Sequence, residues 1–203
     1  MTVPIHIWSD YVCPYCFLAE KPLAAAIAAS GVVTEVRWMP FELRPEPTPT
    51  LRPEEDYLQS GWAQSVYPLA EQMGVEIKLP DVSPQPYSRL AFEGHLFAEA
   101  NGLSYEYTHR MFTAFFRESH DIGDIDVLTC LAEEIGLDAT AFHEALHEGT
   151  YAEAHQALLK RAYEEVQVTA VPSFLIGNRL LRGLADQDAL MSLLQTVEAE
   201  ATP

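Results

Sequence analysis

The sequence predicts an α/β fold in which a block of helices interrupts one small sheet. The first 43 residues have the pattern of a strand, a helix and a second strand. The last 36 or so have the pattern of two short strands and a helix, and the residues between show helical spacing only. Because strands occur only at the two ends, we expect the ends to pack together as one sheet with helices on its faces.

The first strand is expected over Val3–Ser9, where apolar residues alternate with Pro, His and Ser. An Ala- and Leu-rich helix follows and should stop at Gly31, because glycine favours the residue that ends a helix. Pro22 lies within this helix and is expected to kink it or unwind it locally. A second strand is expected over Thr34–Leu43.

The middle of the chain begins with the proline-rich stretch "RPEPTPTLRPEED", which is expected to form a loop. From about Pro53 to Val166, apolar residues recur at spacings of three and four, which is typical of amphipathic helices. Val168–Gly183 then reads as two strands around a Gly-Asn turn, and Asp186 is a plausible N-cap of a closing helix. We therefore assign 1–45 and 167–203 to one discontinuous domain and 46–166 to an inserted helical domain.

The amino-acid composition limits the classes of binding partner and the cellular compartment that we expect. The 203 residues carry 12 basic and 30 acidic side chains, a net charge of −18, which argues against a nucleic-acid or anionic-membrane partner. The sequence shows neither an apolar run of the roughly 18 residues that a membrane span needs nor the pattern of a signal peptide. We expect a cytoplasmic protein, where a reducing environment keeps thiols free.

Two of the three cysteines, Cys13 and Cys16, lie at the predicted turn from the first strand into the first helix. Pro14 favours the first helical position, so Cys13 is expected at the N-cap, where open backbone N–H groups favour a thiolate. Cys16 lies one turn later on the same helix face, but deeper. This spacing suits an attacking thiol followed by a resolving thiol.

Two other interpretations of this pair are weaker. Zinc normally takes four ligands, and the only other cysteine, Cys130, lies far along the chain without a histidine at metal-binding spacing. We therefore expect no metal at the pair. Cys130 itself lies among apolar neighbours in a predicted helix, so we expect it to be buried and inert. Two idle thiols are not expected at such a turn either, because a CxxC pair between a strand and a helix is typical of thioredoxin-like redox proteins.

The motifs resemble a known family. The stretches that carry the resemblance are "SDYVCPYCF", "HDIGDIDVLTCLAEEIGLD" and "VTAVPSFLIGNRLLRG". The first and last resemble the thioredoxin superfamily, and the long helical gap between them resembles its DsbA branch. Together the three resemble FrnE-type, DsbA-like thiol–disulfide oxidoreductases. The resemblance implies a thioredoxin-like fold with a large α-helical insertion.

The same resemblance implies roles for particular residues. Cys13 would be the nucleophile and Cys16 the resolving cysteine, while Pro14 and Tyr15 between them would tune their reactivity. The Val171–Pro172 bond would be the family's cis-proline, which presents backbone to an extended substrate. The substrates would be protein or small-molecule disulfides and thiols. No resident cofactor is implied, although glutathione or a dithiol reductant would be a possible co-substrate.

The chain also departs from the family pattern. Ala170 stands where the family often has glycine, and the Pro14-Tyr15 dipeptide is similar to that of glutaredoxins. The redox potential and any preference for glutathione therefore stay open. Two alternatives also stay open: a glutathione-dependent isomerase or transferase of the kappa-like branch, and a non-enzymatic chaperone or binding module. The sequence does not give the oligomeric state.

Overall fold

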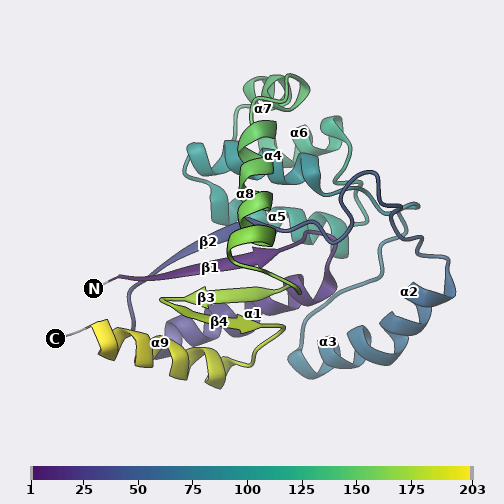
Figure 1. Cartoon of the computed structure of the whole chain (residues 1–203). Helices are drawn as coiled ribbons and strands as arrows, with labels where there is room; N and C mark the ends of the chain where they lie inside the picture. Colours follow the sequence, from purple (N-terminus) through teal and green to yellow (C-terminus); the bar gives the residue numbers. More distant parts are fainter. Residues whose placement is uncertain (1, 202–203) are drawn as a thin grey trace.

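A computed structural model describes residues 2–201. Its sheet has four strands in the order β2-β1-β3-β4, so the first and last parts of the chain pair at the centre of the sheet (Figure 1). The two N-terminal strands run parallel to each other, and the other two neighbouring pairs are antiparallel. The bounds are Val3–Ser9 for β1, Thr34–Pro40 for β2, Ser173–Ile176 for β3 and Arg179–Arg182 for β4.

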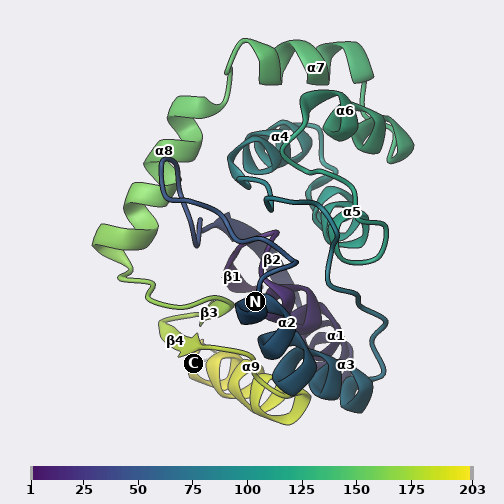
Figure 2. The same ribbon diagram turned by 90° about the vertical axis from the view of Figure 1, so that its right-hand side faces the viewer.

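Helices cover both faces of this sheet, as the sequence predicts. In Figure 1 the first and last helices lie below the sheet and α4 to α8 lie above it. Figure 2, turned by 90°, shows α2 and α3 beside α1, at the lower edge of the molecule. The helices are α1 (Pro14–Ser30), α2 (Asp56–Gly61), η1 (Trp62–Val66), α3 (Tyr67–Met73), α4 (Arg89–Ala100), α5 (Ser104–Phe116), α6 (Ile125–Glu134), α7 (Ala139–His147), α8 (Ala152–Lys160), η2 (Arg161–Glu165) and α9 (Gln187–Ala201), where η1 and η2 are π-helical turns.

The alternation of β1 divides the core between the two faces of the sheet. Ile5 and Ile7 are fully buried in the cluster that contains the apolar side chains of α1 and α9. Trp8 points the other way and packs in a second cluster with Met39 of β2 and Ala162 of η2. Successive strand residues alternate between faces, so the residue after Trp8 returns to the α1 side.

Several local predictions hold. Gly31 ends α1 with a φ of 71°, and Gly177 has a φ of 61° in the turn of the β3–β4 hairpin. The Asp186 carboxylate accepts a hydrogen bond of 2.8 Å from the Ala189 N–H at the start of α9. The expected local unwinding at Pro22 was wrong, because α1 runs without interruption from Pro14 to Ser30. The predicted domain boundaries remain a prediction, because the larger hydrophobic cluster extends from the sheet into the inserted helices.

Two predicted strands are shorter than expected. β2 ends at Pro40 rather than at Leu43. Beyond Pro40, the Phe41 N–H still donates to the Ser9 carbonyl at 3.0 Å, and Glu42 is then buried against His155 of α8 at 2.7 Å. β3 starts at Ser173, because residues 168–172 bend towards the start of α1.

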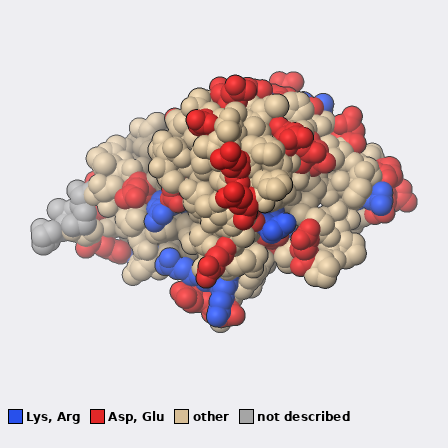
Figure 3. Space-filling view, turned by 90° about the horizontal axis from the view of Figure 1, so that it is seen from above, with Lys and Arg blue, Asp and Glu red and all other residues tan. Residues whose placement is uncertain are grey.

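The helices and the surface agree with a charged globular chain. Over residues 2–201, none of the helices combines the length and the apolar character of a transmembrane segment. Acidic side chains predominate over basic ones on the face that Figure 3 shows, above the inserted helices. Phosphate groups would be repelled from this face, because phosphate binding needs clustered positive charge.

Candidate active site

Cys13 occupies the N-cap of α1, with φ −93° and ψ 113°, and Pro14 follows in the first turn of the helix. The Cys13 carbonyl accepts the first helical hydrogen bonds, at 3.1 Å from the Cys16 N–H and 3.4 Å from the Phe17 N–H. Within the part of the chain that the structure describes, the Cys13 side chain makes no capping hydrogen bond to the helix. The helix N-terminus is therefore left open for a negative charge on sulfur.

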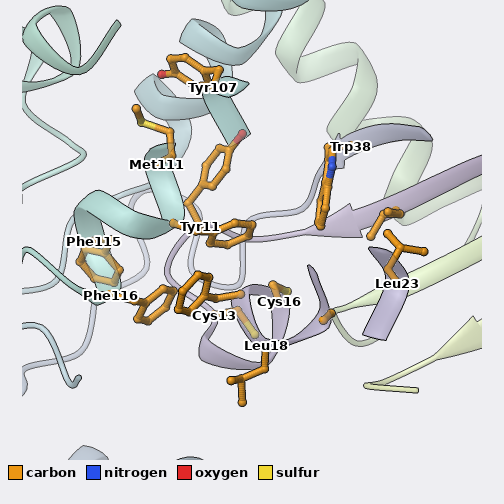
Figure 4. Packing of buried hydrophobic residues seen from close by; sticks show 14 of the residues in the cluster. Tyr11, Cys13, Cys16, Leu18, Leu23, Trp38, Tyr107, Met111, Phe115 and Phe116 are labelled. Carbon is orange, nitrogen blue, oxygen red and sulfur yellow. The ribbon is translucent and has the colours of Figure 1, made fainter. Parts of the chain in front are cut away.

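Cys16 lies one turn further into the helix and is deeper than Cys13. Cys16 is fully buried, whereas 4% of the Cys13 surface is exposed. Figure 4 shows both cysteines at the start of α1, with Phe116 of α5 and Tyr11 nearby. Both sulfurs are reduced thiols in this structure. The difference in depth makes Cys13 the one that a partner reaches first.

The second motif, near the C-terminus, comes to the same place. The Val171–Pro172 peptide bond is cis, and the Cys13 Sγ lies 3.8 Å from the Val171 carbonyl oxygen. The fold brings the two motifs together because β3, which begins at Ser173, pairs with β1 next to Trp8. The structure thus places four of the predicted site residues, Cys13, Cys16, Val171 and Pro172, at one end of the sheet.

The other predicted site residues lie at the rim of this site. Pro14 and Tyr15 are half-buried, as are Val12 and Val171, whereas Pro172 is buried. Val12, Tyr15 and Val171 also pack against the main hydrophobic cluster. The rim around the Cys13 sulfur is therefore partly apolar and partly open, which suits contact with an extended chain or a small thiol.

Cys16 is held as a neutral thiol in the reduced protein. Burial raises its pKa well above the ordinary value, and its hydrogen bond to Cys13 and the charge there raise the pKa further. Two groups near the sulfur act in the opposite direction: the Asp10 backbone N–H and the Ser9 hydroxyl lower this pKa. Burial therefore keeps the proton on Cys16 in the reduced protein.

Asp10 fixes the turn that carries the cysteines. Its backbone carbonyl accepts from the Cys13 N–H at 3.0 Å. Its carboxylate accepts from the Val12 N–H at 3.3 Å and from the Leu43 N–H at 2.7 Å. Burial raises the pKa of Asp10 to about 6. The side chain therefore ties the turn to the segment after β2, and it does not cap α1.

Tyr11 anchors the same turn to the inserted helices. Its buried hydroxyl lies 3.2 Å from His95 Nδ1 of α4 and 3.3 Å from Thr108 Oγ1 of α5. Burial lowers the pKa of His95 to about 4, so this imidazole is neutral near pH 7. Sequence reasoning did not find this network, because no local pattern links residues 84 positions apart.

The structure contradicts the expectation that Cys130 is buried. Cys130 is exposed, on the outer side of α6. The helix buries Leu128, Leu131 and Ala132 instead. Cys130 is two positions after Leu128, about 200° around the helix, so it points away from the core. Apolar neighbours in sequence therefore did not mean apolar neighbours in space.

Among residues 2–201, three or more His, Cys, Asp or Glu side chains do not gather anywhere as a metal-binding group. Sequence reasoning also left Ser9 unnoticed and left the role of Asp10 open. The signal for Ser9 was its place at the end of an alternating strand, on the side that faces α1.

Comparison with known proteins identifies a matching family and a relative of the whole chain. A family model described as a DSBA-like thioredoxin domain matches residues 4–195. The uncharacterised protein YwbO of Bacillus subtilis (strain 168) is 51% identical over 189 residues, which are 93% of this chain and 94% of that protein.

Solved structures share the fold. A probable DsbA oxidoreductase from Streptomyces coelicolor superimposes with a TM-score of 0.83 at 21% identity, over 99% of this chain and 92% of that one. The cytosolic disulfide reductase DsbM from Pseudomonas aeruginosa, solved with GSH, gives a TM-score of 0.71 at 23% identity, over 97% of this chain and 99% of that one. At these identities the likeness concerns the fold.

Proposed function

This chain belongs to the family of DSBA-like thioredoxin domains, and from that premise we propose that it is a dithiol–disulfide oxidoreductase working through Cys13 and Cys16. One observation carries the proposal. Cys13 stands at an open helix N-terminus, with its sulfur facing the Val171 carbonyl and a second thiol one turn deeper. Neither a metal site nor a structural disulfide requires an uncapped helix N-terminus, or one cysteine that is more buried than the other.

In the first step the Cys13 thiolate attacks one sulfur of a substrate disulfide. A bond forms between Cys13 and that sulfur, and the second substrate sulfur leaves as a thiolate. The positive end of the α1 dipole stabilises the thiolate before it reacts. The half-buried rim formed by Val12, Tyr15 and Val171 would hold the substrate, and the backbone before Pro172 would align it.

In the second step the Cys16 thiolate attacks the Cys13 sulfur of the mixed disulfide. The Cys13–Cys16 bond forms, the remaining substrate sulfur leaves as a thiolate, and the proton from Cys16 ends on it. In the mixed disulfide Cys13 is neutral, so its charge no longer raises the pKa of Cys16. Resolution is thus favoured only when a substrate is attached. The reverse sequence would donate a disulfide.

Glutathione is a suitable small-molecule partner, as a reductant of the Cys13–Cys16 disulfide. The support is the fold shared with DsbM, whose structure was solved with GSH, and the open, partly apolar rim beside Cys13. We further propose that the chain is of the FrnE type, on the motifs around Cys13, Cys130 and Pro172, and that it works in the cytoplasm.

Trapping tests the proposal. Cys16→Ser protein, mixed with a disulfide substrate such as insulin or glutathione disulfide, should accumulate a covalent adduct at Cys13, because attack can occur and resolution cannot. Wild type should reduce insulin catalytically with a thiol reductant. Cys13→Ser is the matched control and should form no adduct, provided that both proteins also carry Cys130→Ser, which removes the exposed third thiol.

A folded Cys16→Ser protein that forms no adduct would refute the oxidoreductase proposal. The two open alternatives make different predictions. A chaperone should suppress aggregation equally well when both thiols are replaced. A kappa-like isomerase or transferase should need only the first position, so its activity would survive in Cys16→Ser.

A further inference from the structure

Ser9 is the last residue of β1 and points to the side of the sheet that carries α1. Ile5 and Ile7 of the same strand pack in the cluster of α1, and Ser9 follows at the same two-residue period. Its backbone is fixed, because its carbonyl accepts from the Phe41 N–H at 3.0 Å. Only 2% of the residue is exposed. The side chain is therefore enclosed beneath the first turn of α1, where Cys16 lies.

The Ser9 hydroxyl is not satisfied in the reduced protein. Its Oγ is one of the buried side-chain atoms, within residues 2–201, that lack a partner of hydrogen-bond geometry. The nearby Cys16 sulfur is a neutral thiol, which is a weak acceptor. A buried donor without a good partner costs stability, so a serine at this position needs an explanation.

Cys16 supplies the explanation. The Ser9 hydroxyl and the Asp10 N–H are close enough to this thiol to lower its pKa, although burial keeps the pKa high overall. Hydrogen bonds to an ionised sulfur are stronger than those to a neutral one. Both donors therefore gain their full strength at the moment when Cys16 loses its proton.

We propose that the Ser9 hydroxyl and the Asp10 N–H form a donor pair that stabilises the Cys16 thiolate during resolution of the mixed disulfide. This inference deepens the proposed function and rests on it. The pair acts on the second step alone: Cys16 loses a proton, its thiolate attacks the Cys13 sulfur, and the substrate thiolate leaves and takes up a proton. The charged group facing Cys16 is Cys13, and this charge is removed once the mixed disulfide has formed.

The two steps can be timed separately. Reduced protein is mixed with excess glutathione disulfide, quenched with acid, alkylated and weighed by mass spectrometry. The glutathione adduct at Cys13 should rise and then decay to the Cys13–Cys16 disulfide. In Ser9→Ala the adduct should form at a rate near that of wild type and decay roughly tenfold more slowly or worse, the loss expected for one hydrogen bond to a charged group.

Two further readouts separate this role from a structural one. The resolution rate of Ser9→Ala should reach half its maximum at a higher pH than that of wild type, because the thiolate has lost a donor. Ser9→Thr keeps the hydroxyl and should restore the rate. Thermal stability of Ser9→Ala should match or exceed that of wild type, because the variant deletes an unsatisfied hydroxyl.

Ser173→Ala is the matched control. Ser173 is also buried, at the start of β3, but its hydroxyl already donates to the Ala170 carbonyl at 2.7 Å. This variant should lose stability and keep the resolution rate. If Ser9→Ala resolves the adduct as fast as wild type, the donor pair is overturned. If Cys16→Ser forms no adduct at all, the oxidoreductase proposal fails first, and the two failures are distinguishable.

Discussion

The starts of α1 and α6 differ in what fills the end of the helix. At α6 the N-cap is Asp124, whose carboxylate accepts from the Asp126 N–H at 2.8 Å and from the Val127 N–H at 3.0 Å. At α1 the N-cap is Cys13, and within the described chain its side chain bonds none of the helix N–H groups. Both helices carry a cysteine after the cap, but Cys16 is buried and Cys130 is exposed.

The difference separates a helix end built for stability from one built for reactivity. An aspartate cap satisfies the open N–H groups and stabilises the helix by about 1 kcal/mol. A cysteine cap forgoes that gain, and the unused N–H groups and dipole favour a thiolate instead. The two ends can be distinguished experimentally, because substitutions there should affect activity and stability in opposite ways.

The largest effect is expected from Cys13→Ser. Serine is a good N-cap, so the variant should turn the α1 end into an ordinary one. Disulfide reductase activity with insulin should fall to background, because no nucleophile remains. The free energy of unfolding should stay unchanged or rise by up to about 1 kcal/mol in urea titrations. A variant that keeps its activity, or unfolds, would break the comparison.

The next largest effect concerns Asp10 and pH. Burial raises its pKa from 3.8 to about 6, so folding favours the protonated form. That contribution to stability is complete below about pH 4 and is lost as the pH rises through about 6, a change of about 3 kcal/mol. Asp10→Asn does not titrate. The stability of wild type relative to Asp10→Asn should therefore decrease from pH 4 to pH 8, measured by urea unfolding at each pH.

A difference that is flat with pH would show that Asp10 titrates normally. Wild type that gains on the variant with rising pH would show an ionised carboxylate held by the Val12 and Leu43 N–H groups. Either result would revise the picture of a turn fixed by a buried acid.

A smaller effect is expected at the other helix end. Asp124→Ala removes two hydrogen bonds to the open N–H groups of α6. The free energy of unfolding should fall by about 1 kcal/mol, while the activity with insulin should equal that of wild type. Asp124→Asn keeps an acceptor at the cap and should restore most of the stability. Loss of activity in a folded Asp124→Ala would tie α6 to the reactive site and weaken the contrast.

The sequence predicts much of this molecule, and it does so where the rules are local. The alternation of β1, the glycine that ends α1 and Pro14 after Cys13 follow from the preferences of a few adjacent residues. The pairing of the two chain ends follows from the absence of strand patterns in the middle. These features place Cys13, Cys16 and Pro172 together without any knowledge of side-chain packing.

The features that the sequence does not predict depend on contacts between residues far apart in the chain. Just after the end of β2, Glu42 contacts His155, which lies 113 positions away in the sequence. The anchoring of Tyr11 by His95 is equally remote from any motif. Cys130 is a different case, because the three-and-four spacing of Leu128, Leu131 and Ala132 indicates the buried face of α6 and leaves Cys130 outside it. The helical spacing in the sequence therefore indicated that Cys130 is exposed, but the prediction relied on its apolar sequence neighbours instead.

The smallest effect is expected from Cys130→Ser, and it completes the comparison. Cys130 is exposed on a helix whose end is already capped by Asp124, so its thiol has neither the open N–H groups nor the buried second sulfur that distinguish α1. An exposed substitution away from such features changes stability by no more than about 0.5 kcal/mol. Reductase activity should be that of wild type, and so should the rate of adduct resolution.

Because Cys130 is exposed, it can also react with another copy of the chain. Without reductant, wild type should form a disulfide-linked dimer on a non-reducing gel, and Cys130→Ser should not. If Cys130→Ser instead lost activity while still folded, Cys130 would take part in turnover, and the two-cysteine mechanism would have to give way to a relay of three thiols.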